Sequence, residues 1–146
     1  MMKISTKGRY ALRVMVDLAC ADADKPVALR SVAERQHMTI KYLESIIALL
    51  VRERLVVSTR GKSGGYRLSR PAADYNVYEI LCAAEGDLEP VQCLSDRSMQ
   101  CPLEDNCATV SVWRGLSRVV REYLEGISLA DISGSRRGEF SFCDGI

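Results

Sequence analysis

The spacing of apolar residues changes abruptly near residue 55, and this change constrains the fold more than any other feature of the chain. Before it, apolar residues recur every three or four positions, as on one face of an amphipathic helix. The helices predicted in this way cover residues 5–20, 27–36 and 39–52. After it, residues 55–60 and 65–69 alternate with the period of β-strands, and the glycine-rich stretch 61–64 between them predicts a hairpin.

The order of these elements predicts a winged helix-turn-helix. His37 and Met38 form the expected turn between the second and third helices, and Thr39 is the expected N-cap of the third, the recognition helix. The basic hairpin that follows is the wing. A phosphate-binding loop is the alternative for its glycines, but the GxxxxGK[ST] spacing is absent and a strand follows instead of a helix. The predicted fold class is therefore mainly α with a small β-hairpin wing.

Pro71 ends the wing and divides the chain. The segments predicted from this division are a winged helix over 1–72, a loop with further helices over 73–133, and a disordered tail over 134–146. In the second segment we expect a helix over 76–85 and then a polar, irregular stretch over 86–106. A long helix follows, which begins at about residue 103 or 107 and ends at 126.

The long helix carries apolar side chains that step by three and four residues, which is a heptad seam. These positions are Trp113, Leu116, Val120, Tyr123 and Ile127. Such a stripe can pack on the core of its own chain or on the same helix of a second chain. A long helix beyond a complete winged helix favours the second interpretation, a homodimer.

The net charge of +1 conceals a division between the two halves of the chain. Residues 1–70 carry 14 Lys and Arg against 6 Asp and Glu, whereas residues 71–146 carry 6 against 13. The net charges of the two halves are therefore +8 and −7. A basic half is typical of a nucleic-acid reader, although chance clustering of solvated charges is the alternative. The absence of a long apolar run or an apolar leader predicts a cytoplasmic protein without a membrane partner.

Three motifs together resemble one family: KISTKGRYALRVMVDLA at the start, KYLESI in the third helix and RGKSGGYRLSRP at the wing. They are similar to the Rrf-two family of bacterial repressors over residues 2–133, nearest to its IscR type and beside its NsrR and CymR types. The resemblance implies a DNA-binding transcriptional regulator, not an enzyme, that binds a double-stranded operator as a homodimer.

The resemblance also implies which residues contact DNA. In the family, positions matching Lys7, Arg9 and Tyr10 approach the backbone, those matching Thr39, Lys41, Tyr42, Glu44 and Ser45 begin the recognition helix, and those matching Arg60, Lys62, Ser63 and Gly64 enter the minor groove. The chemistry agrees, because cations neutralise phosphates and a carboxylate at a helix start can accept a hydrogen bond from cytosine. For Glu44 a solvated helix position is the alternative, and for the two tyrosines it is core packing.

Three of the six cysteines, Cys93, Cys101 and Cys107, fall within fifteen residues of the polar stretch. Clustered thiolates suit an iron–sulfur cluster, and the resemblance favours one of the [2Fe–2S] kind, although the sequence alone does not separate two-iron from four-iron types. Zinc binding, thiol redox sensing without a metal, and simple packing are the alternatives. We expect Cys20 and Cys82 to be core residues and Cys143 to be incidental.

The fourth ligand of such a cluster is unknown. The IscR type has a histidine where this chain has Val110, and the NsrR type has an aspartate where this chain has Arg9. The single histidine, His37, is expected at the surface. The remaining candidates are Glu85, Glu104 and Asp105, a donor from a second subunit, or a small molecule.

Two mechanisms follow for the regulator. In the first, the state of a cluster shifts the loop at 93–107 and with it the two DNA-reading heads. In the second, a cluster-free repressor of the CymR kind responds to a protein partner, a metabolite or thiol oxidation. An enzyme with a cysteine nucleophile is disfavoured, because no histidine lies in a catalytic context.

Overall fold

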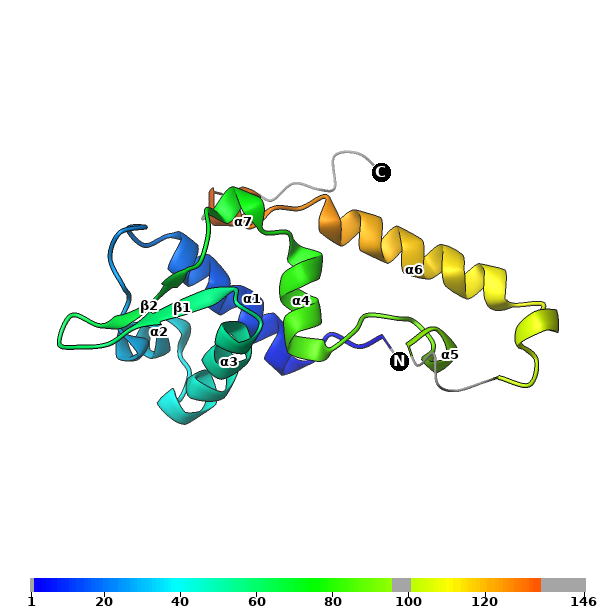
Figure 1. Ribbon diagram of the computed structural model, residues 1–146, viewed down its shortest axis with the longest axis horizontal. Coiled ribbons are helices and arrows are strands. Elements are labelled where there is room, and N and C mark those ends of the chain that lie inside the picture. Colours follow the sequence, from blue (N-terminus) through cyan, green and yellow to red (C-terminus); the bar gives the residue numbers. More distant parts are fainter. Residues whose placement is uncertain (1, 96–100, 135–146) are drawn as a thin grey trace.

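The structure is a computed structural model that describes residues 2–95 and 101–134 (Figure 1). Its elements, in chain order, are α1 (Thr6–Ala19), α2 (Leu29–Gln36), α3 (Ile40–Arg52), β1 (Val56–Thr59), β2 (Gly65–Leu68), η1 (Ala72–Asp74), α4 (Val77–Glu85), α5 (Gln92–Ser95), η2 (Glu104–Asn106), α6 (Val110–Glu125) and α7 (Leu129–Gly134). The predicted fold class, mainly helical with a two-stranded wing, is confirmed.

Local side-chain chemistry sets the helix boundaries. The Thr39 hydroxyl accepts a hydrogen bond from the amide of Tyr42 at 3.3 Å and caps α3, as predicted. Asn76 caps α4 in the same way, through the amide of Glu79 at 2.8 Å. His37 ends α2 in the left-handed conformation, with φ of 53°, and this residue makes the tight turn of the helix-turn-helix.

The wing is an antiparallel pair in which Val56 lies opposite Leu68 and Thr59 opposite Gly65. The chain before α2 extends this sheet by one bridge, since Val27 and Tyr66 exchange both backbone hydrogen bonds. The paired wing glycines are explained by close approach. A Cβ atom on Gly64 would lie 2.3 Å from the carbonyl oxygen of Thr59, and one on Gly65 would lie 2.3 Å from that of Val27.

The main apolar core crosses the Pro71 boundary. Buried side chains of α1, α2, α3 and β1 pack with Tyr75, Ile80 and Ala84 and with Leu129 at the start of α7. A smaller cluster joins the other face of α4 to the chain around α6, and it contains Val77, Leu81, Leu88 and Ile127. In Figure 1, α4 accordingly lies between the α1–α3 bundle and α6. No helix in the described ranges has the length and apolar character to cross a membrane.

The region after α4 differs in detail from the predicted pattern. The long helix begins at Val110, because Cys107 adopts an extended backbone conformation that separates it from the short helix η2. The stretch expected to be irregular contains α5 and η2, and α7 was not predicted. Of the predicted disordered tail over 134–146, Gly134 is the last residue of α7, and the remaining residues 135–146, with Cys143, lie outside the described residues.

Candidate nucleic-acid interface and cysteine segment

The starts of α1 and α3 are joined by two tyrosines. The rings of Tyr10 and Tyr42 meet edge to face, with centroids 5.7 Å apart, and the guanidinium of Arg13 lies 4.9 Å from the Tyr10 ring centroid. Both tyrosines are half-buried. They therefore have a packing role, and their contact brings the first turns of α1 and of the recognition helix together.

Most of the other sequence-predicted DNA contacts are exposed. These residues are Lys7, Arg9, Lys41, Glu44, Ser45, Arg60, Lys62 and Ser63, and Gly64 is half-buried beside them in the wing. Thr39 is also exposed, but its hydroxyl serves as the helix cap. The Ser45 hydroxyl donates to the carbonyl of Tyr42 at 2.6 Å. Exposed cations on the recognition helix and the wing provide the charge that a phosphate backbone requires.

A buried carboxylate locks α2 against α1. The Asp17 side chain is 3% exposed. Arg35 donates to it from Nε, which is shared between both carboxylate oxygens, and from Nη2. The side-chain amide of Gln36 donates a further hydrogen bond at 2.8 Å. Arg13 in turn donates to the side chain and the backbone carbonyl of Gln36. This network fixes the first helix of the helix-turn-helix. Sequence reasoning missed it, although an aspartate on the inner face of a helix was the available signal.

The cysteine segment lies between α4 and α6. Cys93 is exposed on α5, whereas Cys101 and Cys107 are half-buried. The pKa of Cys107 is lowered mainly by a hydrogen bond between its thiol and the Thr109 hydroxyl, 3.5 Å away. The positive charge of Arg114 lowers this pKa further. Cys107 therefore has a larger thiolate fraction than an ordinary cysteine, and the thiolate is the form in which cysteine binds metals and reacts with electrophiles.

Cys82 has the opposite character, and it packs against the smaller apolar cluster as predicted. Burial raises the pKa of its thiol, against the smaller opposing influences of Tyr78 and Arg121. The remaining thiol, Cys20, is half-buried and lies 3.8 Å from the carbonyl oxygen of Ser133. All five cysteines of the described ranges are free thiols.

The donor set can be compared with the needs of an iron–sulfur cluster. Three thiols in one segment match its chemistry, because iron in such clusters is held by thiolates. Within the described residues, no three Cys, His, Asp or Glu side chains converge as they would around a metal ion. Cys93, Cys101 and Cys107 thus fit the cluster by donor type, and binding would require the segment to draw them together.

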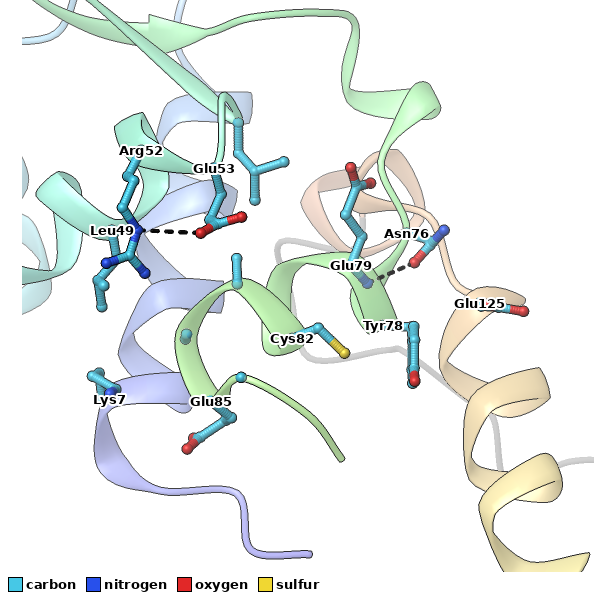
Figure 2. A pocket seen from close by; sticks show the side chains of 14 residues that line it. Lys7, Leu49, Arg52, Glu53, Asn76, Tyr78, Glu79, Cys82, Glu85 and Glu125 are labelled. Atoms are coloured by element: carbon cyan, nitrogen blue, oxygen red, sulfur yellow. Dashed lines mark hydrogen bonds and ion pairs between the residues drawn. The ribbon is translucent and has the colours of Figure 1, made fainter. Parts of the chain in front are cut away.

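The candidate fourth ligands have separate surroundings. Asp105 is exposed in η2, and the side chain of Glu104 lies outside the described part of the structure. His37, which was expected at the surface and not as a ligand, is exposed in the helix-turn-helix. Glu85 lies at the end of α4, where its carboxylate accepts hydrogen bonds from Ser5 and Gly8 of α1. Glu85 and Lys7 line a hollow of about 720 Å³ between α1, α3 and α4. Figure 2 shows the side chains that line this hollow.

The helix α6 presents an apolar stripe to solvent. Val112, Leu116, Val119 and Tyr123 are 58%, 38%, 56% and 47% exposed, and they recur at intervals of four, three and four residues. This exposed stripe differs from the predicted seam, with which it shares Leu116 and Tyr123. Ile127 is buried in the smaller core cluster, and Trp113 and Val120 are half-buried on a neighbouring face.

Comparison with known proteins gives one consistent result. The model of the Rrf2 family, described as "Iron-dependent Transcriptional regulator", matches residues 4–135. The regulator IscR of Yersinia enterocolitica is 34% identical over 131 residues, which are 90% of this chain and 79% of that protein. A putative HTH-type regulator of Azotobacter vinelandii is 42% identical with the same coverage.

Two solved structures are similar over nearly the whole chain. IscR of T. potens superimposes with a TM-score of 0.74 at 38% identity, covering 92% of this chain and 88% of its own. CymR of B. subtilis, named as the global cysteine regulator, gives 0.73 at 33% identity, covering 92% and 98%. The relatives are transcriptional regulators, which confirms the expectation that the chain is not an enzyme. The chain belongs to the Rrf2 family of winged-helix, DNA-binding transcriptional regulators.

Proposed function

We propose that this regulator is a repressor that senses iron–sulfur cluster or redox status through Cys93, Cys101 and Cys107. The observation that carries the proposal is the position of these three thiols, which lie outside both apolar clusters in the segment directly before α6. The lowered pKa of Cys107 supports a chemical role for the segment. A cluster held by these thiolates would supply a redox centre whose state alters the charge of the segment.

The DNA-reading roles are part of the same proposal. The exposed start of α3, with Lys41, Glu44 and Ser45, would lie in the major groove, and the wing, with Arg60 and Lys62, would enter the flanking minor groove. The remaining contacts proposed are Lys7, Arg9 and Tyr10 at the start of α1, Thr39 and Tyr42 in the recognition helix, and Ser63 and Gly64 in the wing.

A homodimer would present two such heads to a palindromic operator, and the exposed stripe of α6 supports it. Burying an apolar stripe of this length against a second copy is favourable. The charges along α6 suit an antiparallel arrangement, because its first half carries Arg114, whereas its second half carries Arg118 and Arg121 against Glu122 and Glu125, so that acidic side chains lie only near its end.

A cluster-free regulator is the second candidate, in which a protein partner, a metabolite or thiol oxidation provides the signal. It is favoured by the separation of the thiols in the described part of the chain, and by the likeness to CymR. The same cysteines would then act as reactive thiols.

The deciding experiment is purification without oxygen, followed by the visible absorption spectrum and measurement of iron and sulfide. A coloured protein with stoichiometric iron and sulfide supports cluster sensing, provided that Cys93→Ser loses the colour and the control Cys82→Ser keeps it. A colourless protein that also fails to incorporate iron and sulfide on reconstitution supports the cluster-free regulator.

A further inference from the structure

The beginning of α1 is capped by a residue far away in the sequence. One carboxylate oxygen of Glu85 accepts hydrogen bonds from the amide of Ser5 at 2.8 Å, from its hydroxyl at 2.7 Å and from the amide of Gly8 at 3.1 Å. Ser5 and Glu85 are 80 positions apart. The first amides of a helix have no partner within the helix, and a carboxylate at this end also interacts favourably with the helix dipole.

Gly8 is adapted to this contact. A Cβ atom at this position would lie 2.2 Å from the same oxygen of Glu85, so only glycine allows the carboxylate to reach the helix end. The Ser5 hydroxyl is 3.4 Å from the Gly8 amide, which makes Glu85 the nearer acceptor. The contact between α4 and the start of α1 therefore depends on both Glu85 and Gly8.

The turn that Glu85 caps is part of the proposed DNA-binding surface. Lys7 and Arg9 flank Gly8 and are exposed, and Tyr10 follows with its ring against Tyr42 of the recognition helix. A movement of this turn relative to α4 would consequently change where two cations and the start of α3 meet the DNA.

On its other side, Glu85 is joined to the cysteine segment by a short series of contacts. Asp87, two residues on, accepts hydrogen bonds from the Ser95 hydroxyl at 2.9 Å and the Glu89 amide at 3.0 Å. Ser95 belongs to α5, the helix that carries Cys93. Leu88 is buried in the smaller core cluster, so this side chain anchors the segment between Glu85 and α5 against α4.

We propose that Glu85 is a positioning residue for DNA binding, through which the cysteine segment sets the first turn of α1. This inference rests on the proposed role of that segment as the sensor. A displacement of α5 reaches Asp87 through Ser95 and then Glu85 through the backbone. The first turn of α1 responds because its amides depend on that carboxylate.

Hydrogen exchange of the Gly8 amide in the full chain tests the coupling without any ligand. Glu85→Ala should accelerate this exchange about tenfold, which corresponds to the loss of one helix cap. Asp87→Ala, which leaves the Glu85 carboxylate in place, should accelerate it about threefold if the segment holds Glu85. The double variant should exchange no faster than Glu85→Ala alone.

Two further variants separate positioning from general stability. Glu85→Gln retains an acceptor oxygen and should restore much of the protection, whereas Gly8→Ala should displace Glu85 and reproduce the DNA-binding defect of Glu85→Ala. Glu79→Ala is the control, because it also removes a carboxylate from α4, but the partner of Glu79 is Arg70 and not α1. It should leave the Gly8 amide unchanged.

DNA affinity supplies the second readout, with a duplex that the wild-type protein selects from a randomised library. Affinity should fall by about fivefold in Glu85→Ala and in Gly8→Ala, as expected for a misplaced turn with two cations. The inference is overturned if Asp87→Ala leaves the exchange of the Gly8 amide unchanged. It is also overturned if the effects of Glu85→Ala and Asp87→Ala on this exchange are additive in the double variant. If the wild-type protein selects no duplex, the proposed DNA-reading roles fail, and Gly8 exchange alone decides the coupling.

Discussion

The hydroxyl of Tyr75 donates a hydrogen bond to the carbonyl oxygen of Leu55 at 2.6 Å. The hydroxyl oxygen of Tyr75 in turn accepts hydrogen bonds from the backbone amides of Ser69 at 3.0 Å and Arg70 at 3.2 Å. Leu55 directly precedes β1 and Ser69 directly follows β2, so one buried phenol holds both ends of the wing. Its ring is 1% exposed and stacks beneath the Arg70 guanidinium.

Replacement of Tyr75 by Phe should therefore destabilise the protein by about 1–3 kcal/mol, because it removes a hydroxyl that donates to the Leu55 carbonyl in a buried hydrogen bond and accepts from two backbone amides. Urea unfolding measures this loss. Tyr78→Phe is the matched control, since its hydroxyl accepts from Arg121 at 2.9 Å in an exposed pair and should matter by less than about 1 kcal/mol. Equal losses in the two variants would contradict the role given to Tyr75.

Tyr75 illustrates what sequence patterns could predict and what they could not. The helices, the wing and the Thr39 cap were predictable, because each depends on spacing or on one residue beside a helix. Tyr75 lies between two helices and outside any periodic run, so its burial follows only from the three-dimensional arrangement. The cap by Glu85 was missed for the same reason, since its partners are 77 to 80 positions away.

The helix α6 shows a second limit. Its apolar residues form two neighbouring stripes, one toward α4 and one toward solvent, and periodicity alone does not assign them. The predicted seam mixed both stripes. Likewise, residue type identified the three cysteines as candidates, but their spacing in the sequence does not give the distances between their thiols in the folded chain.

The buried Asp17 network predicts the effect of a second substitution. Asp17→Ala leaves Arg35 without its partner, but Arg35 is 46% exposed and can recover water, so we expect a loss of about 2 kcal/mol, below the usual cost of breaking a fully buried pair. Urea unfolding again gives the value. Asp17→Asn keeps one acceptor and should lose less, and a variant Asp17→Ala as stable as wild type would show that the network does not hold α2.

The wing predicts how DNA binding should depend on salt. Lys62→Ala should weaken binding to all duplexes and lower the slope of log affinity against log salt by about one, because one phosphate contact is lost. Arg60→Ala should cost about 1–3 kcal/mol and relax specificity if it reads the minor groove. Fluorescence anisotropy at several salt concentrations measures both. Lys25→Ala, an exposed cation paired with Asp22 outside the wing loop 61–64, should change neither.

The thiols predict a difference in pH-dependent reactivity in protein freed of metal. Since its pKa is lowered, Cys107 has more thiolate at neutral pH than an ordinary cysteine, whereas the raised pKa of Cys82 gives it less. The alkylation rate of Cys107 should therefore reach its midpoint at lower pH than that of Cys82, as followed by mass spectrometry of the labelled peptides.

Thr109→Val tests the cause, because it removes the hydroxyl that stabilises the Cys107 thiolate. Alkylation of Cys107 at neutral pH should then slow by about threefold, as its pKa moves back toward the ordinary value of about 8.5. The rate at Cys82 should stay constant. An unchanged rate at Cys107 would mean that Thr109 does not set its reactivity.

The exposed stripe of α6 leads to a prediction about assembly. Val119→Glu places a charge in the middle of the four apolar side chains, where a second copy would have to bury it. We expect this variant to be monomeric in analytical ultracentrifugation and to bind a palindromic duplex at least about tenfold more weakly, because only one head would engage. Ser111→Glu adds the same side chain at an exposed polar position of α6 and should remain dimeric. If Val119→Glu sediments as a dimer with wild-type affinity, the dimer uses another surface and α6 must have a different partner.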